Sequence, residues 1–399
     1  MTTEFIILVI VVLTALAFDF TNGFHDTANA MASSIATGAL KPKTAVALSA
    51  ALNLVGAFLS IEVAKTVGTG LVDLETSGGG SSLMLIVFTG LVGAILWNVF
   101  TWLLGLPSSS SHALFGGMIG ATMASLGTNG VLWAGVLNKV VVPALMAPLI
   151  AGLVAFVGTS LVYRISRPVS EQQKTKNFRL GQISAASLMS LAHGTNDAQK
   201  TMGIIFLALV AANEIDPASD IPFWVRLVCA VAIALGTYLG GWRIIKTMGK
   251  GIVDIDAPQG FAADGSSAAI ILTSSHFGMA LSTTHVATGS IIGSGLGRRA
   301  KVSWSTARRM AIAWVITLPA SGAVGAITWL IGNSINRFTG SDWMGEATVF
   351  LILVGFCFWM WAHSRKSLVS HLDMHTGETV EMHRELHSET LPRPEKAGV

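Results

Sequence analysis

Apolar residues are arranged in runs that are each long enough to cross a lipid bilayer as a helix, which takes about 20 residues. Because such runs recur along the whole chain, we predict an all-α polytopic membrane protein. The predicted spans cover residues 5–21, 44–64, 83–104, 131–163, 223–242, 310–332 and 346–362. The first run begins beside Glu4 and has no basic leader, so we expect a retained helix and not a cleaved secretory signal.

The composition agrees with this pattern. Hydrophobic residues make up 52% of the chain and charged residues 12%, with a mean hydropathy of +0.63, whereas roughly a quarter of the residues in a soluble domain are charged. Cys229 and Cys357 lie in apolar runs, where a thiol usually acts as a small hydrophobic group. We therefore expect neither a disulfide framework nor a protein metal site.

The basic residues are confined to particular loops, and the remaining loops are neutral or acidic. They gather at Lys41 and Lys43, 164–179, 243–250, 298–309, and Arg365 and Lys366. By the positive-inside rule these loops face the cytoplasm, so their charge needs no nucleic-acid partner. The polar residues 362–399 are expected to form a soluble tail.

Two motifs each occur twice, in the same order. GFHDTANA in the first part of the chain matches GTNDAQKT, with Asp26 and Asp197 aligned, and SSSSHALFGG matches LSTTHVATG, with His112 and His285 aligned. We infer a duplicated unit: a first transmembrane repeat over 1–163, a basic cytoplasmic linker over 164–180, and a second repeat over 181–361, followed by the tail at 362–399.

The loop charges give the two repeats opposite orientations. The segment around 82–127 lies between loops predicted to be external, and 258–297 lies between basic loops, so each is expected to form a re-entrant helical hairpin from opposite sides of the membrane. Gly23 and Gly194 are expected to allow helix breaks. Two inverted-topology repeats with broken helices are typical of secondary transporters.

Each repeat carries a polar stripe inside an apolar segment, since side chains three and four residues apart share a helix face. The stripes are Asn22, Asp26 and Asn29 in the first repeat and His193, Asp197 and Lys200 in the second, with His25 and Asn196 beside the aspartates. Ionisable groups in a membrane are usually functional. The structural alternatives are a buried ion pair or a helix cap, and Lys200 could serve only to neutralise Asp197.

The tips of the two hairpins consist of helix-capping residue types, Ser109, Ser110 and Ser111 in the first and Ser282, Thr283 and Thr284 in the second. A helix N-terminus presents free N–H groups that bind oxyanions. Plain capping would explain one such residue at each tip. The carboxylates of Asp26 and Asp197 would face this anion. They favour phosphate, which still carries a proton to donate, over sulfate, which has none, and cation co-transport would compensate the charge.

An enzyme is the rival class, because Ser111 is followed by His112. Consecutive helical residues do not face each other, so we do not expect a nucleophile–base pair there. We expect His112 and His285 to pack near the tips, with a proton-relay role left open. The chain has no Walker motif, which disfavours direct ATP drive.

The four motifs together, GFHDTANA, GTNDAQKTMG, PSSSSH and LSTTH, resemble those of the inorganic phosphate transporter family of the Pit type. The resemblance implies uptake of inorganic phosphate by cation symport and a homodimer in the bilayer. We expect no cofactor, and because nothing resembles an organellar transit peptide, we expect the plasma membrane of a bacterium. The resemblance places Asp26, Asn29, Asn196 and Asp197 in the site, with the tip residues binding phosphate.

Two departures from the family pattern concern the coupling ion. His25 stands where sodium-coupled members have Asn, and Lys200 stands where the first repeat has Asn29. A titratable imidazole removes an oxygen ligand for sodium and adds a proton acceptor, so we expect proton coupling, with Asn22, His25, Asp26, His193, Asn196 and Asp197 as the cation-coupling residues. The alternative is a sodium-coupled carrier of phosphate or a related oxyanion. The resemblance also implies that phosphate can enter as a complex with a divalent metal.

Overall fold

The computed structural model describes residues 3–69 and 80–365, which form helices and no sheet. One isolated antiparallel bridge joins Val253 to Val302. The α-helices are α1 (Thr3–Ala36), α2 (Pro42–Gly56), α3 (Glu62–Thr69), α5 (Gly80–Leu103), α6 (Ser110–Leu126), α7 (Trp133–Val136), α8 (Val142–Ile165), α9 (Glu171–Ala211), α10 (Phe223–Leu239), α11 (Trp242–Lys250), α12 (Ala257–His276), α13 (Thr283–Arg298), α14 (Trp304–Thr339) and α15 (Met344–Ser364).

Within the described residues, five helical stretches are long and apolar enough to cross a membrane: α1, α5, the run from α7 to the end of α8, α14 and α15. The pair α10 and α11, bent by 68° at the break between them, would make a sixth. The chain is therefore a multi-pass membrane protein. Helices α6, α12 and α13 do not meet the same length and apolarity. Most of the tail lies outside the described residues.

The apolar run at 44–64 is not one helix, so this predicted span is wrong. Helix α2 ends at Gly56, and a new helix begins at Glu62. The Glu62 backbone N–H donates to Ser60 Oγ at 3.2 Å in the turn that precedes the second helix. The linker assigned to 164–180 is also mostly helical, because only residues 166–170 separate α8 from α9.

Helices α1 and α9 run unbroken through Gly23 and Gly194, so the expected helix breaks are wrong. The two glycines lie where helices cross closely. A Cβ on Gly23 would lie 2.4 Å from the Ile233 carbonyl oxygen of α10, and one on Gly194 would lie 2.3 Å from the Asn53 carbonyl oxygen of α2. Small residues at such crossings let two backbones approach each other.

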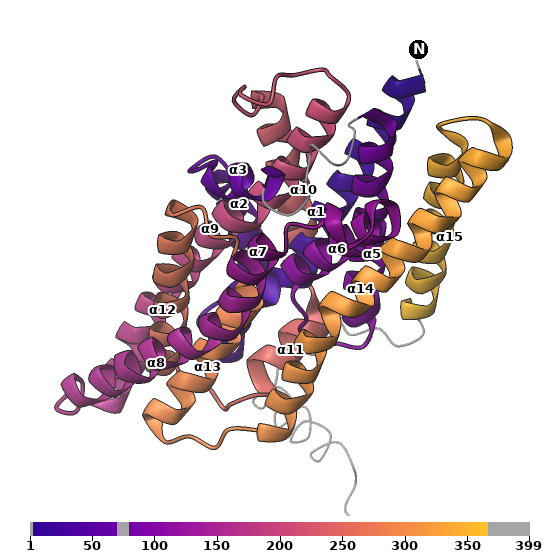
Figure 1. Ribbon diagram of the computed structural model, residues 1–399. Helices are drawn as coiled ribbons and strands as arrows, with labels where there is room; N and C mark the ends of the chain where they lie inside the picture. Colours follow the sequence, from indigo (N-terminus) through magenta and orange to yellow (C-terminus); the bar gives the residue numbers. More distant parts are fainter. Residues whose placement is uncertain (1–2, 70–79, 366–399) are drawn as a thin grey trace, which may run out of the picture.

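Helices α5 and α6 pack together as one hairpin, and α12 and α13 pack as another. Each hairpin also packs on a long helix of the other predicted repeat: α6 lies against α14, and α13 lies against α8 (Figure 1). Both contacts are between glycines. A Cβ on Gly120 would lie 1.9 Å from the Gly322 carbonyl oxygen, and one on Gly293 would lie 2.0 Å from that of Gly152.

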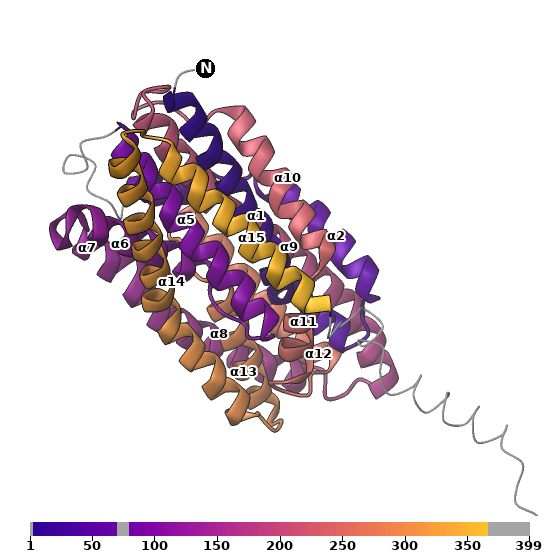
Figure 2. The same cartoon turned by 90° about the vertical axis from the view of Figure 1, so that its right-hand side faces the viewer.

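The interior is unusually polar where α1 and α9 meet. The apolar stretch of α5 is 83% buried, whereas those of α14 and α15, which lie on the side of the bundle that faces the viewer in Figure 2, are each only 28% buried. Such a surface suits a lipid environment. Helices α1 and α9 carry the polar motifs into the middle of the bundle, where α1 contacts both α9 and α13.

Candidate functional site

The polar stripe of α1 is buried, and its histidine and aspartate contact each other. His25 Nδ1 lies 2.7 Å from Asp26 Oδ1. On its other side, His25 Nε2 lies 3.2 Å from Thr101 Oγ1 of α5 and 3.3 Å from Ser108 Oγ. Both side chains are at most 2% exposed. The imidazole therefore links the Asp26 carboxylate to the first hairpin.

The stripe of α9 forms an ion-paired cluster. His193 Nε2 lies 3.0 Å from Asp197 Oδ2, and the Lys200 ammonium makes a short contact with Asp197 Oδ1. The Lys200 and Asp197 side chains are each only 1% exposed. A charge so far from water needs a partner, and this contact provides one for both Lys200 and Asp197. His193 Nδ1 also lies 3.2 Å from Asn53 Oδ1 of α2.

The two tips begin helices with the expected caps. The His112 backbone N–H donates to Ser109 Oγ at 3.1 Å at the start of α6, and the His285 N–H donates to Ser282 Oγ at 3.3 Å at the start of α13. The tips also meet each other. The rings of His112 and His285 lie 4.7 Å apart, and Ser111 Oγ donates to the Leu281 carbonyl oxygen at 3.5 Å.

Tips and stripes form one hydrogen-bonded network that joins the two predicted repeats. Asn29 Nδ2 donates to Thr283 Oγ1 at 3.2 Å and to Thr284 Oγ1 at 3.0 Å. Thr283 in turn donates to Asp197 Oδ2 at 3.1 Å, and Thr284 donates to Asp26 Oδ1 at 3.4 Å. Helix α1 of the first repeat therefore contacts the tip of the second.

Lys200 makes the reciprocal contact. Its Nζ donates to Ser111 Oγ of the first tip at 2.6 Å and to the Leu281 carbonyl oxygen at 2.9 Å. The Lys200 ammonium thus contacts Asp197, the first tip at Ser111 and the segment before the second tip at Leu281. Charge-assisted hydrogen bonds of this kind are stronger than neutral ones. Movement of either tip therefore requires new partners for Lys200.

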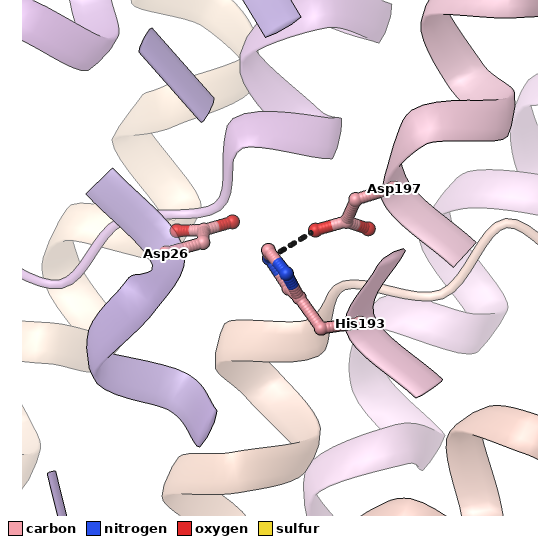
Figure 3. A group of neighbouring side chains, drawn as sticks. All are labelled: Asp26, His193 and Asp197. Carbon is pink, nitrogen blue, oxygen red and sulfur yellow. Dashed lines mark ion pairs between the residues drawn. The ribbon is translucent and has the colours of Figure 1, made fainter. Parts of the chain in front are cut away.

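Asp26 and Asp197 face each other with His193 between them, as Figure 3 shows. One ligand atom from each of the three residues lies within 4.8 Å of the other two, a spacing that a metal ion could bridge. The Lys200 ammonium already contacts Asp197, and its charge disfavours a divalent ion there by like-charge repulsion. We therefore assign no protein metal site to this cluster.

Three of the predicted site residues do not take part in this hydrogen-bonded network. One bonds to other residues, and two have a buried oxygen without a hydrogen-bond partner in the part of the chain that the structure describes. Asn196 Nδ2 donates to Ser275 Oγ at 2.9 Å and to the Met279 carbonyl oxygen at 3.3 Å, so it ties α9 to the second hairpin. Asn22 Oδ1 and Ser110 Oγ are buried and have no hydrogen-bond partner among the described residues. Ser110 lies in the first turn of α6, so its hydroxyl is free to bind a ligand.

Sequence reasoning missed several polar residues near the site. Thr101 and Ser108 contact His25, and Ser33 Oγ lies 2.7 and 2.6 Å from the two oxygens of Asp264 on α12. Asp19 is fully buried in α1. A signal was present for two of them: Asp19 and Ser33 lie seven residues before and after Asp26, on the same face of the helix.

Three comparisons with known proteins agree with one another. The model of the phosphate transporter family matches residues 22–325. A protein of Mycobacterium bovis named probable low-affinity inorganic phosphate transporter is 56% identical over 94% of this chain and 88% of its own length. One of the same name from Bacillus subtilis is 46% identical over 83% of this chain and 98% of its own length. A solved structure named the sodium-dependent phosphate transporter matches with a TM-score of 0.73 at 23% identity, over 82% of this chain and 99% of that chain, which is a likeness of fold.

Proposed function

The chain belongs to the phosphate transporter family, and we propose that it takes up inorganic phosphate together with protons across the plasma membrane of a bacterium. The family and the relatives are transporters, so the enzyme suggested by Ser111 and His112 is set aside. The bacterial relatives support the choice of membrane.

One observation carries the proposal: two Ser/Thr-capped helix N-termini from different parts of the chain meet beside a buried lysine. Helix α6 offers the free hydroxyl of Ser110, helix α13 offers Thr283 and Thr284, and Lys200 supplies a positive charge. Helix N-termini bind oxyanions through free N–H groups and the helix dipole. In the proposed complex, phosphate lies between the tips and takes over the donors that now contact Asp26, Asp197 and Leu281.

The aspartates would then select the protonated anion. Asp26 and Asp197 each accept a hydrogen bond from a threonine of the second tip. A phosphate that displaces this threonine must offer a proton in its place. Phosphate keeps at least one P–OH group near neutral pH, whereas sulfate has none and would bring oxygen atoms against the carboxylates.

Proton coupling is supported by the contact between His25 and Asp26. The imidazole Nδ1 occupies one lone pair of the carboxylate at 2.7 Å, where a sodium ion would need an oxygen ligand. Lys200 makes the corresponding contact with Asp197. Sodium coupling is the second candidate, because the solved structure with the same fold is named sodium-dependent.

Alternating access would come from the two repeats, with the hairpins as re-entrant elements. Helices α6, α12 and α13 are too short or too polar to span a membrane alone, and the Gly120 and Gly293 contacts are equivalent in the two repeats. This arrangement supports inverted repeats, in which each tip is exposed to one side in turn. We also propose that the protein forms a homodimer and that it can transport phosphate as a complex with a divalent metal.

The test is radiolabelled phosphate uptake into proteoliposomes under an inward proton gradient or an equal sodium gradient, with Asp26→Asn as the control. We expect uptake driven by protons alone and abolished in the variant. Uptake that requires sodium would retain phosphate as substrate and refute the interpretation of His25. Absence of phosphate uptake under both gradients would refute the proposed function.

A further inference from the structure

Asp19 is a buried carboxylate that the proposed mechanism does not use. It lies in α1, seven residues before Asp26, and its exposed fraction is 0%. No described residue makes a well-formed hydrogen bond to either of its oxygens. Neither oxygen reaches water in this conformation, so an ionised Asp19 would be both desolvated and unpaired, which is a costly state.

The other two carboxylates of the site each have a basic partner. Asp26 contacts the His25 imidazole, and Asp197 contacts both His193 and Lys200. Among the described residues, no Lys, Arg or His side chain forms an ion pair with Asp19. Of the three carboxylates, Asp19 is therefore the one whose negative charge no ion pair would offset. Phosphate entering the site would add further negative charge near it.

The neighbours of Asp19 identify the cation that could neutralise it. From α9, it is close enough to Asp197 and Lys200 for electrostatic interaction, and the Thr201 hydroxyl lies beside it; from α10, the thiol of Cys229 faces it. Helix α5 carries no titratable side chain. A sodium ion would need a shell of several oxygen atoms, whereas a proton needs only the carboxylate itself.

We propose that Asp19 binds a coupling proton that is transported with phosphate. The inference rests on the proposed proton-coupled uptake and adds a second acceptor, apart from His25. A proton from the external side forms one O–H bond with an Asp19 oxygen before the site closes. The same bond breaks on the cytoplasmic side, and the proton leaves with phosphate. The neutral carboxyl makes the closed site less negative while phosphate crosses.

The matched variants are Asp19→Asn, which keeps the shape and loses the proton site, and Asp19→Glu, which keeps the carboxyl. The control is Glu346→Gln on α15. Glu346 is as buried as Asp19, but its hydrogen-bond partner is Asn336, whose Nδ2 donates to it at 3.1 Å, and not a residue of the stripes or tips. Each protein is reconstituted in proteoliposomes. Phosphate–phosphate exchange is measured without a gradient, and phosphate accumulation is measured under a proton gradient of one pH unit.

We expect Asp19→Asn to retain exchange and to lose about tenfold in accumulation ratio, which is the contribution of one coupled proton at one pH unit. Asp19→Glu should keep accumulation with an altered pH profile, and Glu346→Gln should match the wild type. Normal accumulation in Asp19→Asn would overturn the proposal. So would loss of exchange in a folded Asp19→Asn protein, because that result would assign Asp19 to anion binding.

If Asp19→Asn does not fold, Asp19→Glu decides the question, and an unchanged pH profile in that variant would overturn the proposal. Failure of the proposed function gives a different result. In that case the wild type itself would show no phosphate accumulation under a proton gradient, whereas failure of the Asp19 proposal alone would leave the wild type active and Asp19→Asn equal to it.

Discussion

Replacement of Lys200 by methionine tests whether the buried ion pair organises the site. Methionine has a similar length and no charge, so the variant removes the ammonium that contacts Asp197, Ser111 and the Leu281 carbonyl oxygen. Removal of one partner from a buried pair typically costs 3–5 kcal/mol, because the other charge is left uncompensated. Since His193 remains 3.0 Å from Asp197, we expect a loss at the low end, about 3 kcal/mol.

The assay is thermal unfolding of the purified protein in detergent, for Lys200→Met and for the double variant Asp197→Asn/Lys200→Met. The double variant should recover most of the lost stability, because no unpaired carboxylate remains. The control is Lys139→Met, at an exposed position, which should change stability by no more than about 0.5 kcal/mol. A Lys200→Met protein as stable as the wild type, or a double variant no more stable than the single one, would refute the reasoning.

Three further predictions concern the tips and the coupling ion. Gly120→Ala should lower the unfolding temperature by the equivalent of about 1–3 kcal/mol, because its Cβ would lie 1.9 Å from a backbone oxygen, whereas Gly355→Ala meets no atom within 4 Å and should not. Ser110→Ala should weaken phosphate binding roughly 2- to 12-fold at little cost in stability, as one lost hydrogen bond predicts, while the capping variant Ser109→Ala should cost about 1 kcal/mol of stability. His25→Asn should reduce proton-driven phosphate uptake in proteoliposomes, and unchanged coupling would remove our reason for favouring protons.

Some features of the protein could be predicted from the sequence because they depend only on residues close together in the chain. Apolar length predicts membrane-spanning helices, and the runs at 5–21, 83–104, 131–163, 310–332 and 346–362 all lie in such helices. Capping is also local, so Ser109 and Ser282 start helices as expected. The repeated motifs likewise indicated the phosphate transporter family, which the comparisons confirm.

Other features depend on which helices pack together, and these were missed or wrong. A glycine in a helix is compatible with a break or with a close crossing, and only the position of α10 and α2 shows that Gly23 and Gly194 serve crossings. The apolar run at 44–64 likewise forms two helices, since α2 ends at Gly56 and α3 begins at Glu62. The same local pattern is thus compatible with two structures, and tertiary contacts select one.

By itself, the sequence determined the class of protein, the membrane-length helices and the polar residues that the interior must accommodate, because these follow from hydrophobic length and residue chemistry. Only the tertiary structure decided the partners of those polar residues. Thr284 of the second tip contacts Asp26 of α1, Lys200 contacts Asp197, and Asp19 has no hydrogen-bond partner among the described residues. The free energy of a buried charge depends on neighbours that are distant in the chain, so no local pattern contains it.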